Sequence, residues 1–323
     1  MAPKPISLAL AALALSGCLP DFVDDTTRVT APRVLAVQAE PAEAKESETV
    51  TLTALVADAP GSDTGLPAWS LCIDRKPLSE LGPVSTRCLA GPSPGADVAL
   101  PVDAGPPAQA KLPEDACQLF GPSRPEPKPG QPSGRPVDPD PTGGFYQPVL
   151  AWLGAEPVLG GVRLACELVG APPAITQEYH QRYTPNKNPE LHALEALRND
   201  GSIEVLSEPD AHVFRPHERL RLRVTWPDCP EMGECGGAER YAVYDALSQT
   251  LLERTESFVV SWYGTSGAFA EPRTERAFGD AGEPQGTLNT WTAPASGAVE
   301  IWAVAHDDRG GQSWARGSLS IEP

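Results

Sequence analysis

The sequence is poor in the residues from which metal and catalytic sites are most often built. It has five histidines among 323 residues, and no two of them have the H-x-H or H-E-x-x-H spacing that brings two imidazoles to one metal ion. No CxxC motif and no glycine-rich phosphate loop occurs, and residues 311–315 (GQSWA) depart from the G-x-S-x-G nucleophile motif at the last position. The sequence therefore predicts no catalytic residue, no metal site and no cofactor.

Lysine is also scarce, because six lysines stand beside 19 arginines. Acidic residues outnumber basic ones by 43 to 25, which gives a formal net charge of −18, and neither end of the sequence carries a basic block. Nucleic acid and anionic lipid headgroups are therefore poor partners, since both attract clustered positive charge. The 37 prolines and 29 glycines are typical of a protein built from strands and loops rather than from helices.

A long apolar run occurs only once, near the beginning. Residues 6–15 follow Lys4 and are too few to span a bilayer comfortably, and residues 15–18 (LSGC) place small residues before a cysteine. This stretch resembles the lipobox of bacterial lipoprotein signal peptides. The resemblance implies that residues 1–17 are removed and that Cys18 is acylated, so that membrane lipid becomes a partner. An ordinary secretory signal followed by an unrelated cysteine is the alternative.

The residues after Cys18 predict a tether and a location. Residues 18–31 begin with a polar, acidic stretch, which is typical of a short flexible link between lipid and body. Leu19 stands where an aspartate would resemble the inner-membrane retention signal of enteric lipoproteins. The outer membrane of the bacterial cell envelope is therefore the predicted location.

Six cysteines remain once Cys18 is assigned to lipid. An even number in an exported protein predicts three disulfides without a free thiol, although six cysteines allow fifteen connectivities. Only the last pair is close enough in sequence to be assigned from spacing alone, and half a metal site is its alternative. Order along the chain suggests the pairs Cys72 with Cys88, Cys117 with Cys166, and Cys229 with Cys235.

Alternating hydrophobicity predicts a mainly β protein. Residues 48–56 alternate within a run rich in β-branched side chains, and Trp69 lies in a strand pattern that ends near Cys72. The opening resembles an immunoglobulin-like sandwich, and the end, from the WTAP turn at 291–294 to the hairpin at 307–311, resembles PKD-like and immunoglobulin-like bacterial surface domains. Strands are predicted at 33–39, 48–56, 68–73, 145–153, 161–169, 219–226, 257–263, 298–306 and 313–321, with one helix at 174–182.

An internal repeat indicates two related domains. Residues 32–39 match 189–196 as P-x-[VL]-x-A-[VL]-[QE]-A, and residues 48–52 match 218–222 as E-x-[VL]-x-L. The spacing of leucines in the second copy favours a helix, but its match to 32–39 favours a strand. The predicted fold is two immunoglobulin-like β-sandwich domains in tandem. Domain 1 spans 32–184, and domain 2, immunoglobulin-like or PKD-like, spans 185–323.

Residues 91–144 interrupt the first predicted domain. They contain 14 prolines and 8 glycines, and proline lacks the N–H group that a central strand needs, so an insertion outside the core is predicted. Asp138 and Asp140 suggest Ca²⁺ ligands, but the flanking prolines favour a solvated, extended segment. An acidic loop rich in glycine and proline is predicted at 264–286.

One predicted surface has the composition of a recognition site. If strands 298–306 and 313–321 pair, Trp302 and Trp314 share an outward face beside Arg316, and aromatic rings beside arginine bind sugars or proteins. The alternative is that the 264–286 loop or the first domain covers this face. The charged residues 306–308 at the hairpin are expected to form a solvated turn.

These observations predict a non-enzymatic binding or structural module of the cell envelope, with envelope proteins or glycans as partners. The alternative is an accessory envelope hydrolase or a metal-dependent enzyme whose site is built from the 91–144 insertion or the 264–286 loop.

Overall fold

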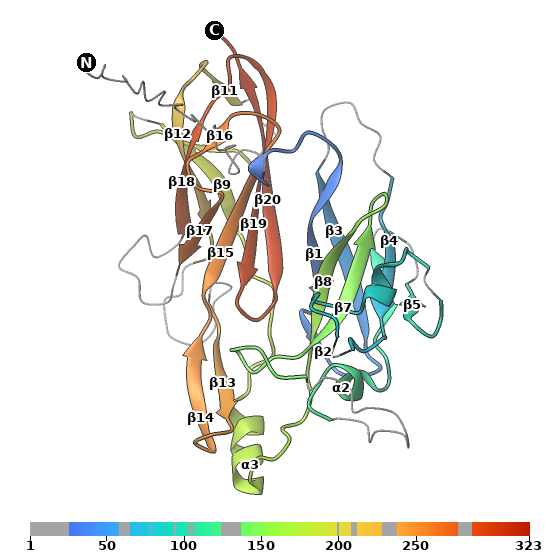
Figure 1. The fold of residues 1–323 in the computed structure, drawn as a ribbon. Helices are drawn as coiled ribbons and strands as arrows, with labels where there is room; N and C mark the ends of the chain where they lie inside the picture. The colour runs from blue at the N-terminus through green and yellow to red at the C-terminus, as the bar shows by residue number, and fades with distance from the viewer. Residues whose placement is uncertain are drawn as a thin grey trace, which may run out of the picture.

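The computed structural model describes residues 26–57, 65–77, 79–93, 95–102, 105, 107–123, 137–198, 200–207, 212–227, 238–276 and 286–323. The chain is mainly β, as predicted, with several sheets and two short α-helices in this described part. Figure 1 shows two β-rich halves side by side, an N-terminal half with β1 to β8 and a C-terminal half with β9 to β20. The C terminus lies at one end of the molecule and α3 (Pro173–Arg182) at the other.

The N-terminal half consists of two sheets that enclose one apolar core. Their strand orders are β1-β3-β6 and β2-β8-β7-β4-β5. Leu52, Trp69 and Val149 are among the core residues between the sheets, in agreement with the predicted alternation. The elements are β1 (Arg33–Glu40), β2 (Glu43–Ala44), β3 (Thr49–Ala57), β4 (Ala68–Cys72), the 3₁₀ helix η1 (Thr86–Leu89), β5 (Ala99–Pro101), β6 (Ala108–Lys111), α2 (Ala116–Leu119), β7 (Tyr146–Trp152) and β8 (Pro157–Leu164).

The C-terminal half repeats this sandwich-like arrangement around a separate core. Its sheets have the orders β10-β9-β12-β18-β16 and β11-β20-β19-β15-β17, and β13 and β14 form a hairpin of their own. Trp262, Trp291 and Ile301 are buried between the two sheets. The elements are β9 (Ala193–Leu197), β10 (Ile203–Val205), β11 (His212–Phe214), β12 (Arg219–Thr225), β13 (Arg240–Asp245), β14 (Thr250–Thr255), β15 (Phe258–Gly264), β16 (Ala268–Phe269), β17 (Arg273–Arg276), β18 (Gly286–Thr292), β19 (Gly297–Asp307) and β20 (Gln312–Ile321).

The two segments of the internal repeat occupy equivalent strands. β1 pairs antiparallel with β3, and β9 pairs antiparallel with β12 in the same way. In each half, a short strand that precedes the second of these two strands belongs to the other sheet. It pairs in parallel with the last strand of its half, β2 with β8 and β11 with β20. The strand predicted at 189–196 is therefore confirmed in its second part, 193–197, against the helical spacing of its leucines.

The repeated glutamate closes the same turn in both halves. Glu48 Oε2 accepts the backbone N–H of Lys45 at 2.8 Å, and Glu218 Oε2 accepts that of Arg215 at 3.0 Å. The residue before each glutamate has a positive φ, 64° in the first turn and 58° in the second. The carboxylate thus supplies an acceptor to an N–H that the tight turn leaves unpaired.

Residues 91–144 are not all outside the core. They include β6, which pairs with β3 and buries Ala108 and Ala110. Because β6 is at the edge of its sheet, the prolines around it cost no central hydrogen bonds. Residues 124–136 of the predicted insertion lie outside the described residues.

Two further differences concern the C-terminal half. The predicted 264–286 loop contains β16 and β17, each added to the edge of a sheet, while residues 277–285 lie outside the described part. The β13–β14 hairpin was not predicted, although Tyr241 and Val243 alternate within it and a polar turn follows.

Two of the predicted disulfides are confirmed. Cys72 bonds to Cys88 and holds η1 against the end of β4, and Cys117 bonds to Cys166 and holds α2 against the chain after β8. Cys18, Cys229 and Cys235 lie outside the described residues, so acylation and the third pair stay predictions.

The end of the predicted tether packs against the body. Val29 is 1% exposed, and its N–H donates to Gly264 O at 2.9 Å. The described chain therefore begins beside the end of β15 that is remote from α3 (Figure 1).

We expect Glu48→Ala to lower the free energy of unfolding by about 1 kcal/mol, because the turn N–H loses its acceptor. Glu48→Gln keeps an acceptor and should lose less. Urea titration measures both, with the exposed Glu114→Ala as the control, expected within about 0.5 kcal/mol of the parent. If the alanine variant is as stable as the parent, Glu48 does not stabilise the turn.

Candidate functional site

The turn between β19 and β20 is buried where the two halves meet. Asp307 Oδ1 accepts the N–H groups of Arg309 at 2.9 Å and Gly311 at 2.8 Å, which closes the turn. Gly310 has a φ of 95°, and a Cβ at Gly311 would collide with Asp307 Oδ2, so both positions require glycine. The expectation of a solvated turn holds for Asp308, which is exposed, and is wrong for Asp307, which is 7% exposed. Arg309 in the same turn is 0% exposed.

Arg309 is the centre of a buried charged cluster. Its Nη1 donates to Glu239 at 3.4 Å and to Glu256 at 3.2 Å. Its Nη2 donates to Glu43 at 3.4 Å and to the carbonyl oxygen of Thr184 at 2.5 Å. Glu43 lies on β2, Thr184 in the chain between the halves, and the other two glutamates flank the β13–β14 hairpin. One guanidinium therefore ties the C-terminal turn to three other segments.

Aromatic rings complete the surroundings of this guanidinium. Its central carbon lies 4.6 Å from the ring centroid of Tyr241 and 5.8 Å from that of Tyr183. Cation–π attraction is strongest where water is excluded. The Tyr183 hydroxyl in turn donates to Glu43. The rings and the carboxylates together replace the water that the charge loses on burial.

A second buried arginine extends the cluster into the N-terminal half. Arg163 forms an ion pair with Glu43 at 3.3 Å, and its Nη1 donates to Thr142 Oγ1 at 2.7 Å and to the Tyr146 hydroxyl at 3.1 Å. The Tyr146 hydroxyl lies 2.7 Å from Asp140 Oδ2, to which it donates. Asp140 is therefore a member of a protein hydrogen-bond network, and the expectation that it lies in a solvated extended segment is wrong.

The cluster contains more carboxylates than arginines. Burial raises the pKa of Glu256 to about 8, with the negative charge of Asp307 adding to the effect. Burial likewise raises the pKa of Asp307 to about 6, and it raises the pKa of Glu239. These shifts share one cause, since a low-dielectric interior penalises the charged form of an acid.

Two clefts open beside the cluster, on either side of residues 137–145. The larger, of about 610 Å³, lies between the N-terminal half, α3 and the β13–β14 hairpin. The smaller, of about 460 Å³, lies on the N-terminal half. Both are within the size range of small-molecule sites. Residues that line the larger cleft include Asp138, Phe145, Val169, Tyr179, Tyr183 and Tyr244.

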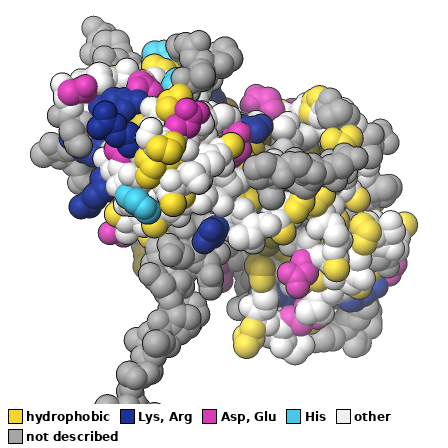
Figure 2. Space-filling model, turned by 90° about the horizontal axis from the view of Figure 1, so that it is seen from above, with side chains coloured by type: hydrophobic (Ala, Val, Ile, Leu, Met, Phe, Trp, Pro, Cys, Tyr) yellow, Lys and Arg dark blue, Asp and Glu magenta, His cyan; other side chains and the backbone are white. Residues whose placement is uncertain are grey.

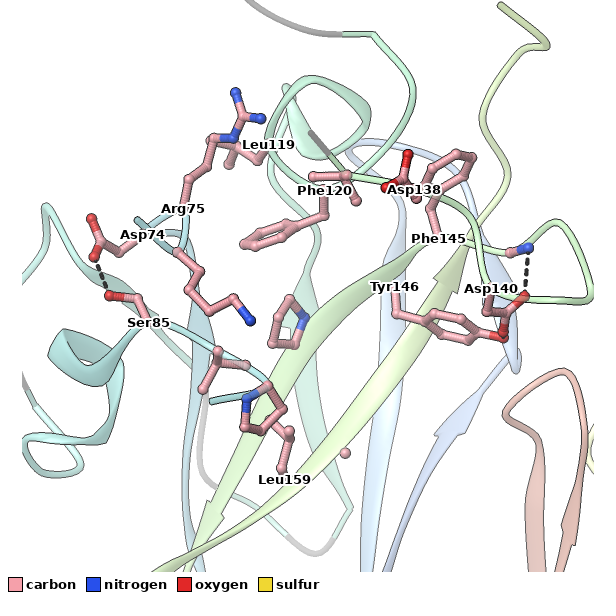
Figure 3. A pocket seen from close by; sticks show the side chains of 17 residues that line it. Asp74, Arg75, Ser85, Leu119, Phe120, Asp138, Asp140, Phe145, Tyr146 and Leu159 are labelled. Atoms are coloured by element: carbon pink, nitrogen blue, oxygen red, sulfur yellow. Dashed lines mark hydrogen bonds between the residues drawn. The ribbon is translucent and has the colours of Figure 1, made fainter. Parts of the chain in front are cut away.

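Figure 3 shows the smaller cleft from close by. Phe120 and Phe145 lie on one side of it, and Asp74 lies opposite, where its carboxylate accepts a hydrogen bond from Ser85 Oγ at 2.5 Å. Tyr146 turns its hydroxyl toward Asp140 at the edge of the cleft. Asp138 and Phe145 line both clefts, so the two sites meet at these side chains.

The chemistry of the larger cleft is suited to binding. Aromatic and aliphatic side chains offer apolar contact, and the exposed Asp138 forms no hydrogen bond or ion pair in the described part of the chain. His180 Nε2 lies 3.0 Å from the Glu167 carboxylate, with both side chains exposed at the rim. Among the described residues, no group of three His, Cys, Asp or Glu side chains is close enough to hold a metal ion.

The predicted recognition face, formed by Trp302, Trp314 and Arg316, is largely covered. Trp302 pairs in register with Arg316, so both side chains face outward from the C-terminal core as expected. However, Trp302 is 2% exposed, because it packs against Ala36 and Leu55 of the N-terminal half. Trp314 is half-buried in the same apolar cluster, and Arg316 is exposed and bonded to a glutamate of β19. The alternative considered from the sequence, coverage by the first half, is what the structure has.

The arginines of β12 are exposed at the beginning of the strand. Arg219 and Arg221 are exposed, while Arg223 forms an ion pair with Glu195 at 2.7 Å. β12 begins at the end of the molecule where the C terminus lies. Figure 2 looks onto this end and shows Lys and Arg side chains gathered over the C-terminal half, beside acidic ones. This end is therefore of mixed charge.

Sequence reasoning missed the residues that form the buried cluster. Glu43, Glu239 and Glu256 each stand in a short polar stretch that marks a turn, and nothing in their local pattern indicates burial. Arg309 was noted only as part of the 307–311 hairpin. The glycines at 310 and 311 were the available sign that this turn is packed against another segment, because glycine permits the close approach of another backbone.

No protein-family model and no curated protein matches the sequence. The adhesin InvE of Yersinia pseudotuberculosis is 11% identical with a TM-score of 0.23, and the match covers 88% of this chain and 58% of the adhesin. Trypsin-activated alpha-2-macroglobulin of Escherichia coli is 9% identical with a TM-score of 0.22, over 91% of this chain and 18% of that protein. The chain spans less than two thirds of either protein, and similarity this low supports no conclusion about function.

No helix in the described part of the chain is long and apolar enough to cross a lipid bilayer.

We expect Arg309→Met to lower the free energy of unfolding by roughly 3–5 kcal/mol, because it leaves several buried carboxylates without their shared cation. Arg316→Met removes an exposed ion pair and should cost no more than about 1 kcal/mol. Urea or thermal unfolding of the two variants measures the difference. Equal losses would mean that Arg309 contributes no more than a surface arginine.

Proposed function

We propose that this chain is a lipid-anchored protein of the bacterial cell envelope, held in the outer membrane by acylated Cys18. Its body acts as a non-enzymatic binding or structural module, and envelope proteins or glycans are its partners. The lipobox-like stretch before Cys18 supports the anchor, and the clefts beside the junction support the binding role.

The body is proposed to consist of two immunoglobulin-like domains in tandem, 32–184 and 185–323. The repeated turn and the repeated pairing of β1, β2 and β3 with β9, β11 and β12 support this division. So does the presence of one separate apolar core in each half. A strand that crosses from one sheet to the other within its own half is typical of such sandwiches.

The position of the larger cleft is the observation that carries the binding role. It lies between α3 and the β13–β14 hairpin, at the end of the molecule opposite to the C terminus. Thr26 lies only eight residues after Cys18, a span of at most about 28 Å when fully extended. The anchor therefore keeps the membrane near the first described residues, and the cleft is turned away from it. The buried cluster behind the cleft holds its walls, which belong to both halves, in one arrangement.

The hydrolase alternative is not proposed, since no observation within the described residues favours it.

Replacement of the acylated residue tests the anchor. We expect Cys18→Ala to move the protein from the membrane fraction to the soluble fraction, because two or more acyl chains are what holds a lipoprotein stably. Cell fractionation followed by detection of the protein is the measurement. The anchor is disproved if the variant sediments with membranes to the same extent as the parent.

Replacement of a ring in the larger cleft tests the binding site. Tyr244→Ala should weaken binding at least tenfold, because a buried aromatic anchor contributes on the order of 2 kcal/mol. Leu247→Ala is the control, since Leu247 is 97% exposed on the same hairpin and does not line the cleft. The measurement is titration of both variants against immobilised envelope glycans and purified envelope proteins. Identical binding by parent and Tyr244→Ala would place the site elsewhere.

A further inference from the structure

The junction between the halves encloses an excess of negative charge. Glu43, Glu256 and Asp307 are buried, and Glu239 is nearly so. Two buried guanidiniums face them. Arg163 forms an ion pair with Glu43, and Arg309 forms ion pairs with Glu43, Glu239 and Glu256. Asp307 forms no ion pair with another described residue. An uncompensated charge in such a place is costly, and the usual outcome is that the group takes up a proton.

Unpaired atoms mark where a proton fits. Asp307 Oδ2 and Asn186 Oδ1 are buried acceptors without a hydrogen-bond partner. The two side chains already touch, because Asn186 Nδ2 lies 3.5 Å from Asp307 Oδ1. A carboxylic acid adds the donor that a carboxylate lacks. Protonation of Asp307 therefore removes one negative charge. It also supplies a hydrogen-bond donor where two acceptors have no partner.

The remaining groups around this cluster do not supply the missing positive charge. The Lys187 ammonium lies 3.6 Å from Glu239 but is largely exposed, and Arg254 is exposed and donates to a carbonyl oxygen. Burial lowers the pKa of His306 to about 4, and the positive charge of Arg273 adds to the effect. Asp308 adds a further carboxylate, bonded to Ser257 and Tyr241. The hydroxyls of Tyr146 and Tyr183 face the cluster as neutral groups.

We propose that this junction is a proton-dependent clasp: the closed arrangement retains one proton on the buried carboxylates of Glu256 and Asp307, and it loosens when that proton is lost as the pH rises. The clasp is a property of the body and does not depend on the anchor or on the ligand of the cleft.

The direction of the pH dependence follows from the acid pKa values. The pKa of Glu256 is raised by burial to about 8, from about 4.3 in an unfolded chain. Between these values the folded protein binds more protons than the unfolded chain, so stability is highest at the acid side and falls as the pH rises. One proton corresponds to about a tenfold change in the unfolding constant per pH unit, and the loss is complete above about pH 8. Asp307 acts in the same direction up to about pH 6.

Urea unfolding at pH 6 and pH 9 tests the clasp with the variant Glu256→Gln. The amide stays neutral in both the folded and the unfolded chain, so the variant lacks this proton linkage. From pH 6 to pH 9 the unfolding constant of the parent should therefore rise at least tenfold relative to that of the variant. Glu190→Gln is the matched control, because Glu190 is exposed in the chain between the halves, and it should follow the parent at both pH values.

Hydrogen exchange gives a local readout that does not depend on global stability. The N–H groups of Asn186 and Lys187 donate to Glu43 and Glu239 within the junction. After correction for the intrinsic pH dependence of exchange, their protection in the parent should fall at least tenfold from pH 6 to pH 9, and Glu256→Gln should retain it. The proposal is overturned if the parent is equally protected and equally stable at both pH values. It is also overturned if the unfolding constants of the parent and of Glu256→Gln change by the same factor between pH 6 and pH 9.

Discussion

A single buried guanidinium determines how the two halves of this protein are held. Arg309 lies at the tip of the β19–β20 hairpin and bonds to three other segments. Its partners are Glu43 on β2, Thr184 in the connecting chain, and Glu239 and Glu256 at the base of the β13–β14 hairpin. Its desolvation is costly, and several charged hydrogen bonds and two aromatic rings offset that cost. Since the arrangement is stable only when all partners are present, it fixes the hairpin, the connecting chain and the β13–β14 hairpin together.

Apolar contact supplies the other part of the junction. Trp302 and Val304 on the outward face of β19 pack against Ala36 and Leu55 of the N-terminal half. A register shift between Val34 and Ala36 inserts an extra residue into β1. Val34 and Val37, three positions apart, therefore both enter the core of the N-terminal half, and Ala36 enters the junction. The non-directional apolar contact brings the halves together, and the charged cluster defines their orientation.

A proposed binding role depends on this rigidity. The larger cleft takes its walls from the N-terminal half, α3 and the β13–β14 hairpin, so any movement at the junction would change its shape. Arg163 and Tyr183 both line the cleft, and each contacts Glu43 of the cluster. Proton loss from the cluster would therefore change the shape of the cleft through side chains that belong to both.

The sequence by itself determined the repeat and most of the long core strands, because each depends on local alternation or a turn. The order of the cysteines suggested the two described disulfides, and the tertiary structure selected them among the possible connectivities. The helix at 174–182 and the strand at 219–226 were predicted to within a residue or two for the same reason. Only the tertiary structure decided which outward faces are covered. From β19 alone, Trp302 is expected to be an exposed ring and Arg309 a solvated turn residue. A local pattern shows which side chains point away from their own core, but it does not show what packs against them. The carboxylates of the cluster stand at positions 43, 239, 256 and 307 of the chain. No periodicity links them, so their meeting is a consequence of how the two halves pack.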